Sequence, residues 1–465
     1  MAEDLAYLTA AEMLRAYRAK KLSPVEVTRA LLRRLARLNP AINAFLLVDE
    51  EAALAQARAS EARWLKGRPK GLLDGVPTSI KDLMLTRGWP TLRGSRTSDP
   101  KGPWPEDAPC VTRLREQGAV LFGKTTTPEF GWKGVTDSAL SGVTRNPWNL
   151  DKTPGGSSGG AAAALAAGLG PLAIGSDGGG SIRIPAGFSG VFGIKANFGR
   201  VPNWPASMMA TISHVGPMSR SVRDAALFLN VIALPDSRDW YTVPHQPINW
   251  TRFLGQGVKG LRIAFSPALG YAKVDPEVAD KVARAARVFA RLGAHVEQRD
   301  PGFADPTDIF LTHWRAGAAK GLGGLPRAKF RLLEEGLQEF VRAGQRLKLA
   351  DYMVAVDRRV ALATHMRQFH ERYDLLLTPT LAVQAFDVER TVPRGARMRG
   401  WWEWTPFSYP FNLTQQPACS IPCGFTGAGL PVGLQIVGGN FREDLVFRAA
   451  AAYEAAAPIA RRPKL

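Results

Sequence analysis

The sequence predicts an α/β fold. We expect one large domain over residues 1–465, with a central mixed, mostly parallel β-sheet covered by helices on both faces. Helix, strand and loop signals alternate along the chain, which is typical of strands laid side by side with helices packed against them. Strand signals occur on both sides of a Gly- and Ser-rich central stretch, and the chain has no low-complexity linker or internal repeat. We place the core at about residues 70–235 and 373–457, and a helical insertion at about 305–372.

The N-terminal segment predicts three helices and one strand. Helices over residues 9–20 and 23–38 each begin at a Thr/Ser-x-x-Glu capping box, formed by Thr9 with Glu12 and by Ser23 with Glu26. A third helix is expected over residues 50–66. The apolar run that follows predicts a short strand over residues 76–80, which would place Lys81 at its end.

The rest of the chain continues the alternation. Residues 305–372 carry helix signals and no strand signal, and residues 418–423 and 431–437 predict paired strands around a Gly-rich turn. The other predicted strands are GAVLFGKT at 118–125, VFGIK at 191–195, LRIAF at 261–265, AHVEQ at 294–298 and YDLLLTPT at 373–380. The other predicted helices cover residues 221–233, 276–292 and 443–456.

The chain is strongly basic, with 60 Lys and Arg against 41 Asp and Glu, a formal charge of +19. An excess of this size raises the question of a polyanionic partner. The basic residues are spread along the chain and mixed with acidic ones, which is typical of solvated helix faces. We therefore expect a charged, solvated surface and no nucleic-acid binding.

Cysteine content and the N-terminus both indicate a cytoplasmic protein. The three cysteines, Cys110, Cys419 and Cys423, form no paired framework, as expected in a reducing compartment. The first residues, MAEDLAYL, are acidic where a signal peptide would be basic, and no apolar run approaches about 20 residues. Cys419 and Cys423 lack a neighbouring His cluster, so we expect no metal site.

The segment 154–190 concentrates the candidate chemistry. It reads PGGSSGGAAAALAAGLGPLAIGSDGGGSIRIPAGFSG, and two of its serines, Ser157 and Ser181, lie beside glycines. Glycine allows the backbone to approach a ligand closely, and N–H groups outside secondary structure can stabilise developing negative charge. We interpret the segment as an acyl-transfer site.

Two familiar motifs match the sequence without the context they need. Residues 118–125 fit the phosphate-loop pattern, but their apolar interior predicts a buried strand and not a flexible loop. The nucleophile elbow G-x-S-x-G fits around Ser157, but turn-forming residues precede it where a strand is required. None of the six histidines lies in a Gly-rich context that would indicate a base for a serine.

Without a histidine, a lysine or a carboxylate must accept the serine proton. A lysine can do so only when neutral, and burial lowers the pKa of an ammonium group. Lys81, after the apolar run VPTSI, fits a buried lysine better than those on polar surfaces. The alternative is a strand-end lysine that extends to water.

These segments together resemble the amidase signature family. The resemblance rests on GVPTSIKD, NPWNLDKTPGGSSGG, GSDGGGSIRIPAGFSGVFGIK, FGRVP and LPVGLQIVG, and it extends over nearly the whole chain. It implies the amidase signature fold and a Ser-cisSer-Lys triad. Residue by residue, it implies that Ser181 is the nucleophile, Ser157 the serine after a cis peptide bond, and Lys81 the general base.

The resemblance also implies where the substrate binds. It places an oxyanion hole at the N–H groups of Ser181 and of three glycines, Gly178, Gly179 and Gly180, and a backbone contact to substrate at Gly131. We expect Asp177 and Arg183, on either side of the glycines, to hold the loop; direct contact with substrate is the alternative. The aromatic stretch 400–412, with Met208 and Met209, is either an apolar acyl pocket or core packing.

The expected function is therefore hydrolysis of a carboxylic amide to an acid plus ammonia or an amine. The alternative is the glutaminase subunit of a tRNA-dependent amidotransferase, which would use the same triad. We expect no cofactor and no metal. The expected partner is a small-molecule amide, with no membrane and no nucleic acid, and a homodimer remains open.

Overall fold

The computed structural model describes residues 5–465, and its centre is an eleven-stranded sheet in the order β1-β3-β2-β6-β8-β7-β12-β13-β11-β9-β10. The strands are β1 (Phe45–Val48), β2 (Pro77–Lys81), β3 (Val120–Thr125), β6 (Leu172–Asp177), β7 (Phe192–Lys195), β8 (His214–Ser219), β9 (Arg262–Phe265), β10 (His295–Gln298), β11 (Leu375–Pro379), β12 (Ala418–Phe425) and β13 (Pro431–Gly438). Two short strands, β4 (Asp137–Ser138) and β5 (Gly142–Val143), pair separately. The sheet thus includes β1, β9 and β10, which lie outside the two core ranges predicted from the sequence.

The sheet is mixed, as expected. Parallel pairing joins β3, β2 and β6 on one side and β11, β9 and β10 on the other. The strands between these two groups pair antiparallel, as does β1 at the edge, so antiparallel pairs form a larger share than the sequence alternation predicts. One of these pairs has a local cause, since β12 and β13 form a hairpin closed by the turn at Thr426–Leu430 and a hairpin forces antiparallel pairing. The other antiparallel pairs join strands that are distant in the sequence.

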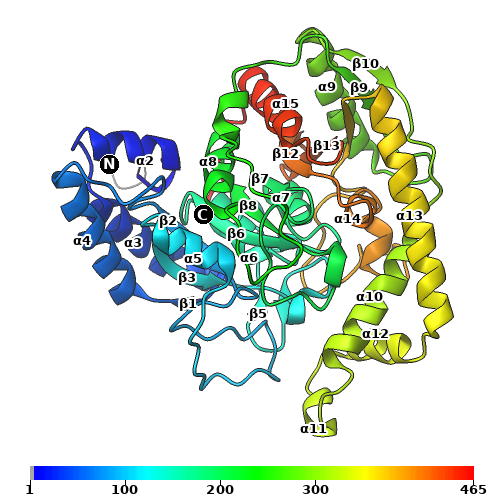
Figure 1. Ribbon diagram of the computed structural model, residues 1–465, viewed down its shortest axis with the longest axis horizontal. Helices are drawn as coiled ribbons and strands as arrows, with labels where there is room; N and C mark the ends of the chain where they lie inside the picture. The colour runs from blue at the N-terminus through cyan, green and yellow to red at the C-terminus, as the bar shows by residue number, and fades with distance from the viewer. Residues whose placement is uncertain (1–4) are drawn as a thin grey trace.

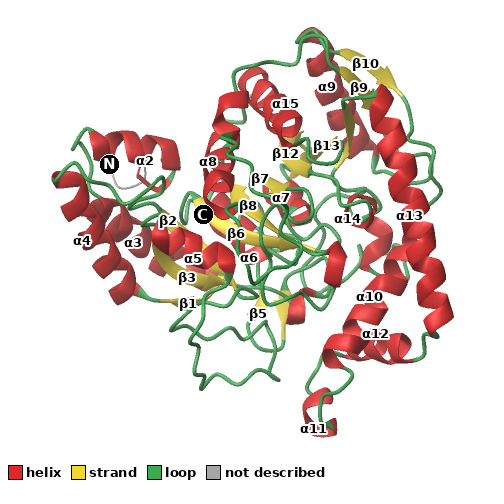
Figure 2. Cartoon of the chain, in the orientation of Figure 1, coloured by secondary structure: helices red, strands yellow, loops and turns green. Residues whose placement is uncertain are grey.

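Fourteen α-helices occur among residues 5–465, and they cover both faces of the sheet (Figure 2). They are α2 (Ala10–Arg18), α3 (Pro24–Ile42), α4 (Glu50–Leu65), α5 (Pro109–Glu116), α6 (Gly159–Ala166), α7 (Arg183–Ser189), α8 (Val222–Ile232), α9 (Pro276–Arg291), α10 (Thr307–Leu322), α11 (Arg327–Phe330), α12 (Glu335–Gln345), α13 (Leu349–Arg372), α14 (Pro410–Leu413) and α15 (Glu443–Ala456).

Successive strand residues divide between two buried clusters, because side chains alternate across a sheet. In β6, Leu172 and Ile174 pack with α5, α8, α9 and α15, whereas Ala173 packs with α6 and α7. In β11, Leu377 packs in the first of these clusters and Leu376 packs with α13. The sheet is therefore buried on both faces, which explains its almost continuous apolar strands.

Both N-terminal capping boxes are confirmed. The Thr9 hydroxyl accepts a hydrogen bond from the Glu12 N–H. At the start of α3, the Ser23 hydroxyl accepts from the Val25 N–H, and the Glu26 carboxylate accepts from the Ser23 N–H. Helix α3 is longer than predicted: it continues through Pro40 to Ile42 and ends at Asn43, which adopts the left-handed conformation. A proline predicts a helix end, but here it is accommodated in the last turn of the helix.

The two ends of the sheet carry different helices (Figure 1). The N-terminal helices α2, α3 and α4 lie beside β1 and β3, and α10, α12 and α13 lie at the opposite end. Residues 307–372 contain α10 to α13 and no strand, which is the helical content expected for that segment. Helix α10 packs against both α12 and α13.

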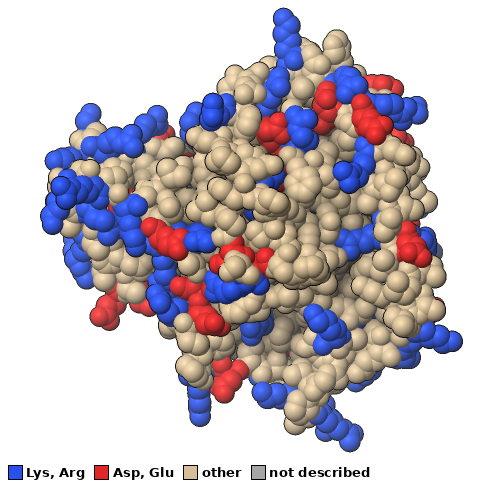
Figure 3. Space-filling model, viewed as in Figure 1, with Lys and Arg blue, Asp and Glu red and all other residues tan. Residues whose placement is uncertain are grey.

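Lys and Arg side chains are scattered over the face shown in Figure 3, with Asp and Glu among them, and the basic side chains are denser over the N-terminal helices.

Among the described helices, none is both long and apolar enough to cross a bilayer.

Candidate active site

Lys81 ends β2 in the middle of the molecule. Its side chain is fully buried, and its neighbour Ile80 packs on the α5 and α8 face of the sheet, so Lys81 points to the opposite face. There its Nζ lies 2.7 Å from Ser157 Oγ, 2.9 Å from Ser158 Oγ and 3.0 Å from Ser176 Oγ. The alternative of a lysine that extends to water is therefore wrong.

Burial holds the pKa of the Lys81 ammonium well below its usual range. The carboxylate of Asp177 acts in the opposite direction and does not cancel the effect of burial. The site thus favours the neutral amine, which is the protonation state that a general base requires.

The hydroxyl partners indicate how a neutral Lys81 is oriented. Ser158 donates its own hydroxyl hydrogen to the carbonyl of Ser176, at 3.2 Å, so the Ser158 oxygen is left to accept from Lys81. A neutral amine has two N–H donors and one lone pair. If Ser158 and Ser176 accept the two N–H groups, the lone pair faces the hydroxyl of Ser157.

Ser157 lies in the turn that leads into α6. The peptide bond between Gly156 and Ser157 is cis, as the resemblance implies. Gly131 lies against it: a Cβ at Gly131 would be 3.1 Å from Ser157 Oγ, so only glycine leaves this space open. The Gly131 N–H donates to the Pro128 carbonyl, whereas the Gly131 carbonyl accepts no hydrogen bond from the described residues and is available to another molecule.

Ser181 lies between β6 and α7, and a backbone hydrogen bond joins it to the preceding turn. The N–H of Ser158 donates to the carbonyl of Ser181 at 3.1 Å, so the turns that carry Ser157 and Ser181 are in direct contact. Within residues 5–465 the Ser181 hydroxyl makes no hydrogen bond. The structure thus joins Lys81 and Ser157 by their side chains, and it joins Ser181 to them by its backbone.

The glycine loop presents backbone donors beside Ser181. The N–H groups of Gly178, Gly179 and Ser181 have no hydrogen-bond partner in the described part of the chain. The Gly180 N–H differs, because it donates to Asp177 Oδ1 at 2.7 Å. Three of the four donors implied by the resemblance are therefore open to an oxyanion, and the fourth shapes the loop.

Asp177 and Arg183 fix the conformation of this glycine loop through hydrogen bonds. Both side chains are fully buried, and the guanidinium makes two hydrogen bonds to the carboxylate, each 2.9 Å long. Arg183 also donates to Asn412, Gln435 and the Ser408 carbonyl. Burial acts to raise the pKa of Asp177, but Arg183 outweighs it and holds that pKa well below its usual range. These contacts use all the N–H donors of the guanidinium, which favours the expected structural role.

Aromatic side chains pack closely on the glycines. A Cβ at Gly178 would lie 3.1 Å from the Trp314 ring, and one at Gly179 would lie 2.8 Å from the Phe310 ring, both rings being on α10. Trp401 and Trp404, from the aromatic stretch, are buried in the same cluster. Core packing is thus the main role of these tryptophans.

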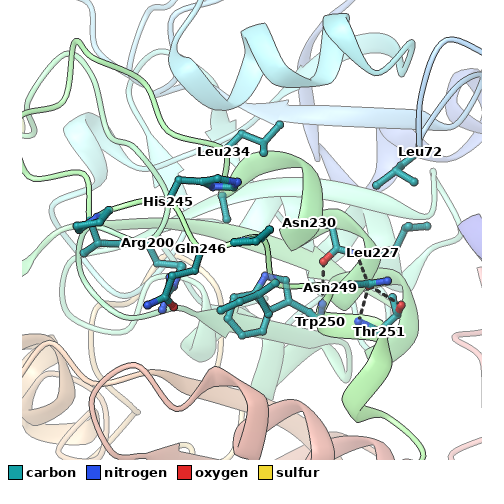
Figure 4. A pocket seen from close by; sticks show the side chains of 15 residues that line it. Leu72, Arg200, Leu227, Asn230, Leu234, His245, Gln246, Asn249, Trp250 and Thr251 are labelled. Atoms are coloured by element: carbon teal, nitrogen blue, oxygen red, sulfur yellow. Dashed lines mark hydrogen bonds between the residues drawn. The ribbon is translucent and has the colours of Figure 1, made fainter.

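A cavity of about 250 Å³ opens beside Lys81. Ser176, which is hydrogen-bonded to Lys81, lines it together with Phe130 and Met208. Lys81, Ser157 and Ser181 do not line it themselves, so Ser176 is its link to the lysine. A second cavity, seen in Figure 4, is lined by the segment that carries His245, Asn249 and Trp250 and by no hydrogen-bond partner of Lys81. Of the two, the cavity beside Lys81 is therefore better placed to receive a substrate.

The rejected motifs are confirmed as structural. Residues Val120–Thr125 form the buried strand β3, and Lys124 of the apparent phosphate loop lies 3.4 Å from the carboxylate of Asp82. Among the described residues, no histidine hydrogen-bonds to Ser157 or Ser181. His214 is buried near Lys195, and burial holds its pKa well below the usual range, which favours a neutral ring.

Sequence reasoning missed Ser158 and Ser176, the two other hydroxyls on Lys81. Both lie in the Gly- and Ser-rich segment 154–190, so their residue type was visible. Their role depends on β2 and β6 being neighbours in the sheet, and the sequence does not show which strands pair.

Comparison with known proteins agrees with this site. The sequence model of the Amidase family matches residues 26–447. An acylamidase of Rhodococcus erythropolis is 38% identical, over 98% of this chain and 97% of its own. The glutamyl-tRNA(Gln) amidotransferase of Myxococcus xanthus has one subunit that is 36% identical, over 97% of each chain.

Solved structures show the same architecture. A bacterial aryl acylamidase of the amidase signature enzymes superposes with a TM-score of 0.91 at 31% identity, covering 97% of this chain and 96% of that one. A 6-aminohexanoate cyclic dimer hydrolase, solved with its substrate, gives a TM-score of 0.90 at 30% identity, covering 99% of both chains. The family match and these full-length similarities show that the chain belongs to the amidase signature family of amide hydrolases.

Proposed function

We propose that the protein hydrolyses a carboxylic amide through an acyl-enzyme on Ser181, with Ser157 passing protons between Ser181 and Lys81. The observation that carries the proposal is the 2.7 Å contact between Ser157 Oγ and a buried Lys81 Nζ whose pKa is held well below its usual range. A serine hydroxyl becomes a useful nucleophile only when a base removes its proton, and this lysine is such a base.

In the first step, Lys81 Nζ accepts the Ser157 proton while Ser157 Oγ accepts the Ser181 proton. Ser181 Oγ forms a bond to the carbonyl carbon of the amide, and the carbonyl π electrons move to oxygen. The N–H groups of Gly178, Gly179 and Ser181 would stabilise that oxyanion. One such donor is worth about 3 kcal/mol to the transition state.

In the second step, the relay runs in reverse. The Lys81 ammonium returns a proton to Ser157, and Ser157 gives its proton to the amide nitrogen. The carbon–nitrogen bond then breaks with both electrons on nitrogen, and a neutral amine or ammonia leaves. Water then attacks the Ser181 ester while the relay takes its proton. The bond between the acyl carbon and Ser181 Oγ breaks, the relay returns a proton to Ser181 Oγ, and the acid is released. Direct proton transfer between Ser157 and Ser181 belongs to the proposal and not to the observed contacts, because the Ser181 hydroxyl makes no hydrogen bond within residues 5–465.

The glutaminase component of an amidotransferase is the second candidate, because the chain is also similar to a protein of that kind. Glutamine carries an α-ammonium group beside its carboxylate, and such a group is normally bound by an acidic side chain. The described residues that line the cavity beside Lys81 include no Asp or Glu. This observation favours an amide without an ammonium group over glutamine.

Substitution of the nucleophile tests the proposal. Ser181→Ala should lower kcat/KM for a chromogenic aryl amide by at least about 10³-fold. Intact-mass spectrometry should show that a serine-directed phosphonylating inhibitor labels the wild type and leaves the variant unlabelled. Ser237→Ala, at an exposed loop serine, is the matched control and should behave like the wild type. Labelling of Ser181→Ala, or release of ammonia from glutamine as the preferred reaction, would contradict the proposal.

A further inference from the structure

Arg93 lies in the cavity beside Lys81. Among the described residues that line this cavity, it is the one charged residue. The other lining residues are mainly apolar, and they include Leu83, Met84, Phe130 and Leu322. A single cation in a largely apolar cavity is a strong determinant of which molecules bind there.

The backbone around Arg93 is held in place by the residue after Lys81. The Arg93 N–H donates to the carbonyl of Asp82 at 3.1 Å, and the Asp82 carboxylate accepts from the N–H groups of Leu92 and Gly94. The Arg93 carbonyl accepts from the Phe130 N–H at 2.7 Å. These hydrogen bonds fix the position of Arg93 relative to the proposed base.

Arg93 adopts a conformation that arginine seldom adopts. Its φ is +56°, in the left-handed region where glycine and asparagine are favoured. An arginine kept in such a conformation costs stability, and residues of this kind are concentrated at ligand sites. The side chain is therefore a candidate for a function that a smaller residue would not supply.

The guanidinium has few partners within the protein. In the described chain it makes one hydrogen bond, from Nη1 to the Thr91 carbonyl at 3.3 Å, and it has no carboxylate within 4 Å. The Asp82 carboxylate already has a positively charged partner other than Arg93, because Lys124 Nζ lies 3.4 Å from it. Most donors of Arg93 are thus available to a molecule in the cavity, and a planar guanidinium matches a carboxylate with two parallel hydrogen bonds.

We propose that Arg93 binds a carboxylate of the substrate, so that the preferred substrates are amides that also carry an anionic carboxylate. Monoamides of dicarboxylic acids and N-acyl amino acids, whose carboxyl group is free, belong to this class. The inference rests on the proposed function, because it assigns the part of the substrate that does not react. It goes beyond that function by naming a substrate class and the residue that selects it.

Paired substrates test the selection. Succinamic, glutaramic and adipamic acids place a carboxylate at the acyl end, and N-acetyl-4-aminobutyrate places one at the amine end. Each is compared with a neutral amide of the same length. We expect the wild type to favour at least one anionic member over its neutral partner by about 10- to 100-fold in kcat/KM, the range of a charged hydrogen-bonded pair.

Three variants complete the experiment. Arg93→Met should reduce the anionic-to-neutral ratio of kcat/KM to near one, chiefly through KM, and Arg93→Lys should retain part of the preference. Arg96→Met removes an equal charge from an exposed position three residues away and should leave the ratio unchanged.

The outcomes separate the two proposals. Equal turnover of anionic and neutral amides by the wild type would overturn the role of Arg93 and leave the Ser181 mechanism in place, even if Arg93→Met did not fold. An unchanged ratio in a folded Arg93→Met variant would do the same. If the wild type hydrolysed none of these amides, that result would instead contradict the proposed function.

Discussion

At the scale of single residues, the protonation of Lys81 has the clearest consequence. The proposed mechanism requires a neutral lysine, and burial holds the pKa of Lys81 well below its usual range. We therefore expect kcat/KM to fall as pH decreases through that lowered pKa and to be constant above it, because protonation removes the base. A pH–rate profile with a neutral amide measures this acid limb.

Lys81→Ala supplies the control for this profile. It should lower activity by at least about 10³-fold, and added small amines should restore part of it by occupying the space that the side chain leaves. An acid limb that persists in Lys81→Ala with the same midpoint would assign the titration to another group.

Gly180 provides a second residue-scale prediction. Its φ is +122°, and an added Cβ would lie 2.5 Å from Ser408 Oγ and 2.7 Å from Ile184 Cδ1. Gly180→Ala should therefore lower the free energy of unfolding by about 2–4 kcal/mol, because both the backbone and the packing oppose it. Thermal and urea denaturation measure the loss. Gly324→Ala is the control, since nothing lies within 4 Å of a Cβ there, and its effect should stay within about 0.5 kcal/mol.

The site could be predicted from the sequence only where residue type was informative. Lys81, Ser157 and Ser181 lie in segments whose glycine and apolar content is unusual. Arg93 gave no such signal, because it is one of many arginines, and only the fold shows that its side chain lies in a cavity. The hydrogen bond from the Gly180 N–H to the Asp177 carboxylate could not be predicted either, because it depends on the path of the loop.

At the scale of elements, local signals predicted helices well and strand pairing less well. Capping boxes lie within a few residues of the helices they start, so Ser23 and Glu26 identify α3 from the sequence alone. Strand direction depends on distant partners. The antiparallel pairing of β6 with β8 joins residues about 40 positions apart, and no local pattern records it.

The Asp177–Arg183 pair connects β6 to α7, and its loss should destabilise the loop between them. Arg183→Met leaves a buried carboxylate without its partner, so we expect the free energy of unfolding to fall by about 3–5 kcal/mol. Arg183→Lys keeps the charge and loses the two parallel hydrogen bonds, and should lose less. Denaturation measures both variants, with Asp177→Asn and the double variant completing the cycle.

Kinetics separate this structural role from substrate contact. If Arg183 only holds the loop, folded Arg183→Lys should retain its KM, and kcat should fall as the N–H groups of Gly178 and Gly179 move. A large rise in KM with normal stability would instead place Arg183 in contact with the substrate.

At the scale of the whole molecule, the excess positive charge has two interpretations. A component of an amidotransferase would use it to bind tRNA, whereas a solvated surface would not. Figure 3 shows acidic residues among the basic ones on the face it presents. Several exposed or half-buried arginines are paired with carboxylates, as Arg113 is with Glu116 and Arg442 with Asp444. Such pairs reduce the local field available to a phosphate backbone.

We therefore expect the purified chain to hydrolyse simple amides without a partner, and tRNA to have no effect on the rate. The measurement is ammonia or amine release at about 0.15 M salt, with and without tRNA, because nucleic-acid binding by charge alone weakens steeply as salt rises. Polyglutamate serves as the control polyanion for non-specific effects at low salt. Specific stimulation by tRNA at this ionic strength, with glutamine as the preferred amide, would identify the surface charge as a binding site and the chain as a component of an amidotransferase. Rates unaffected by either polymer would leave the charge as a property of a solvated surface.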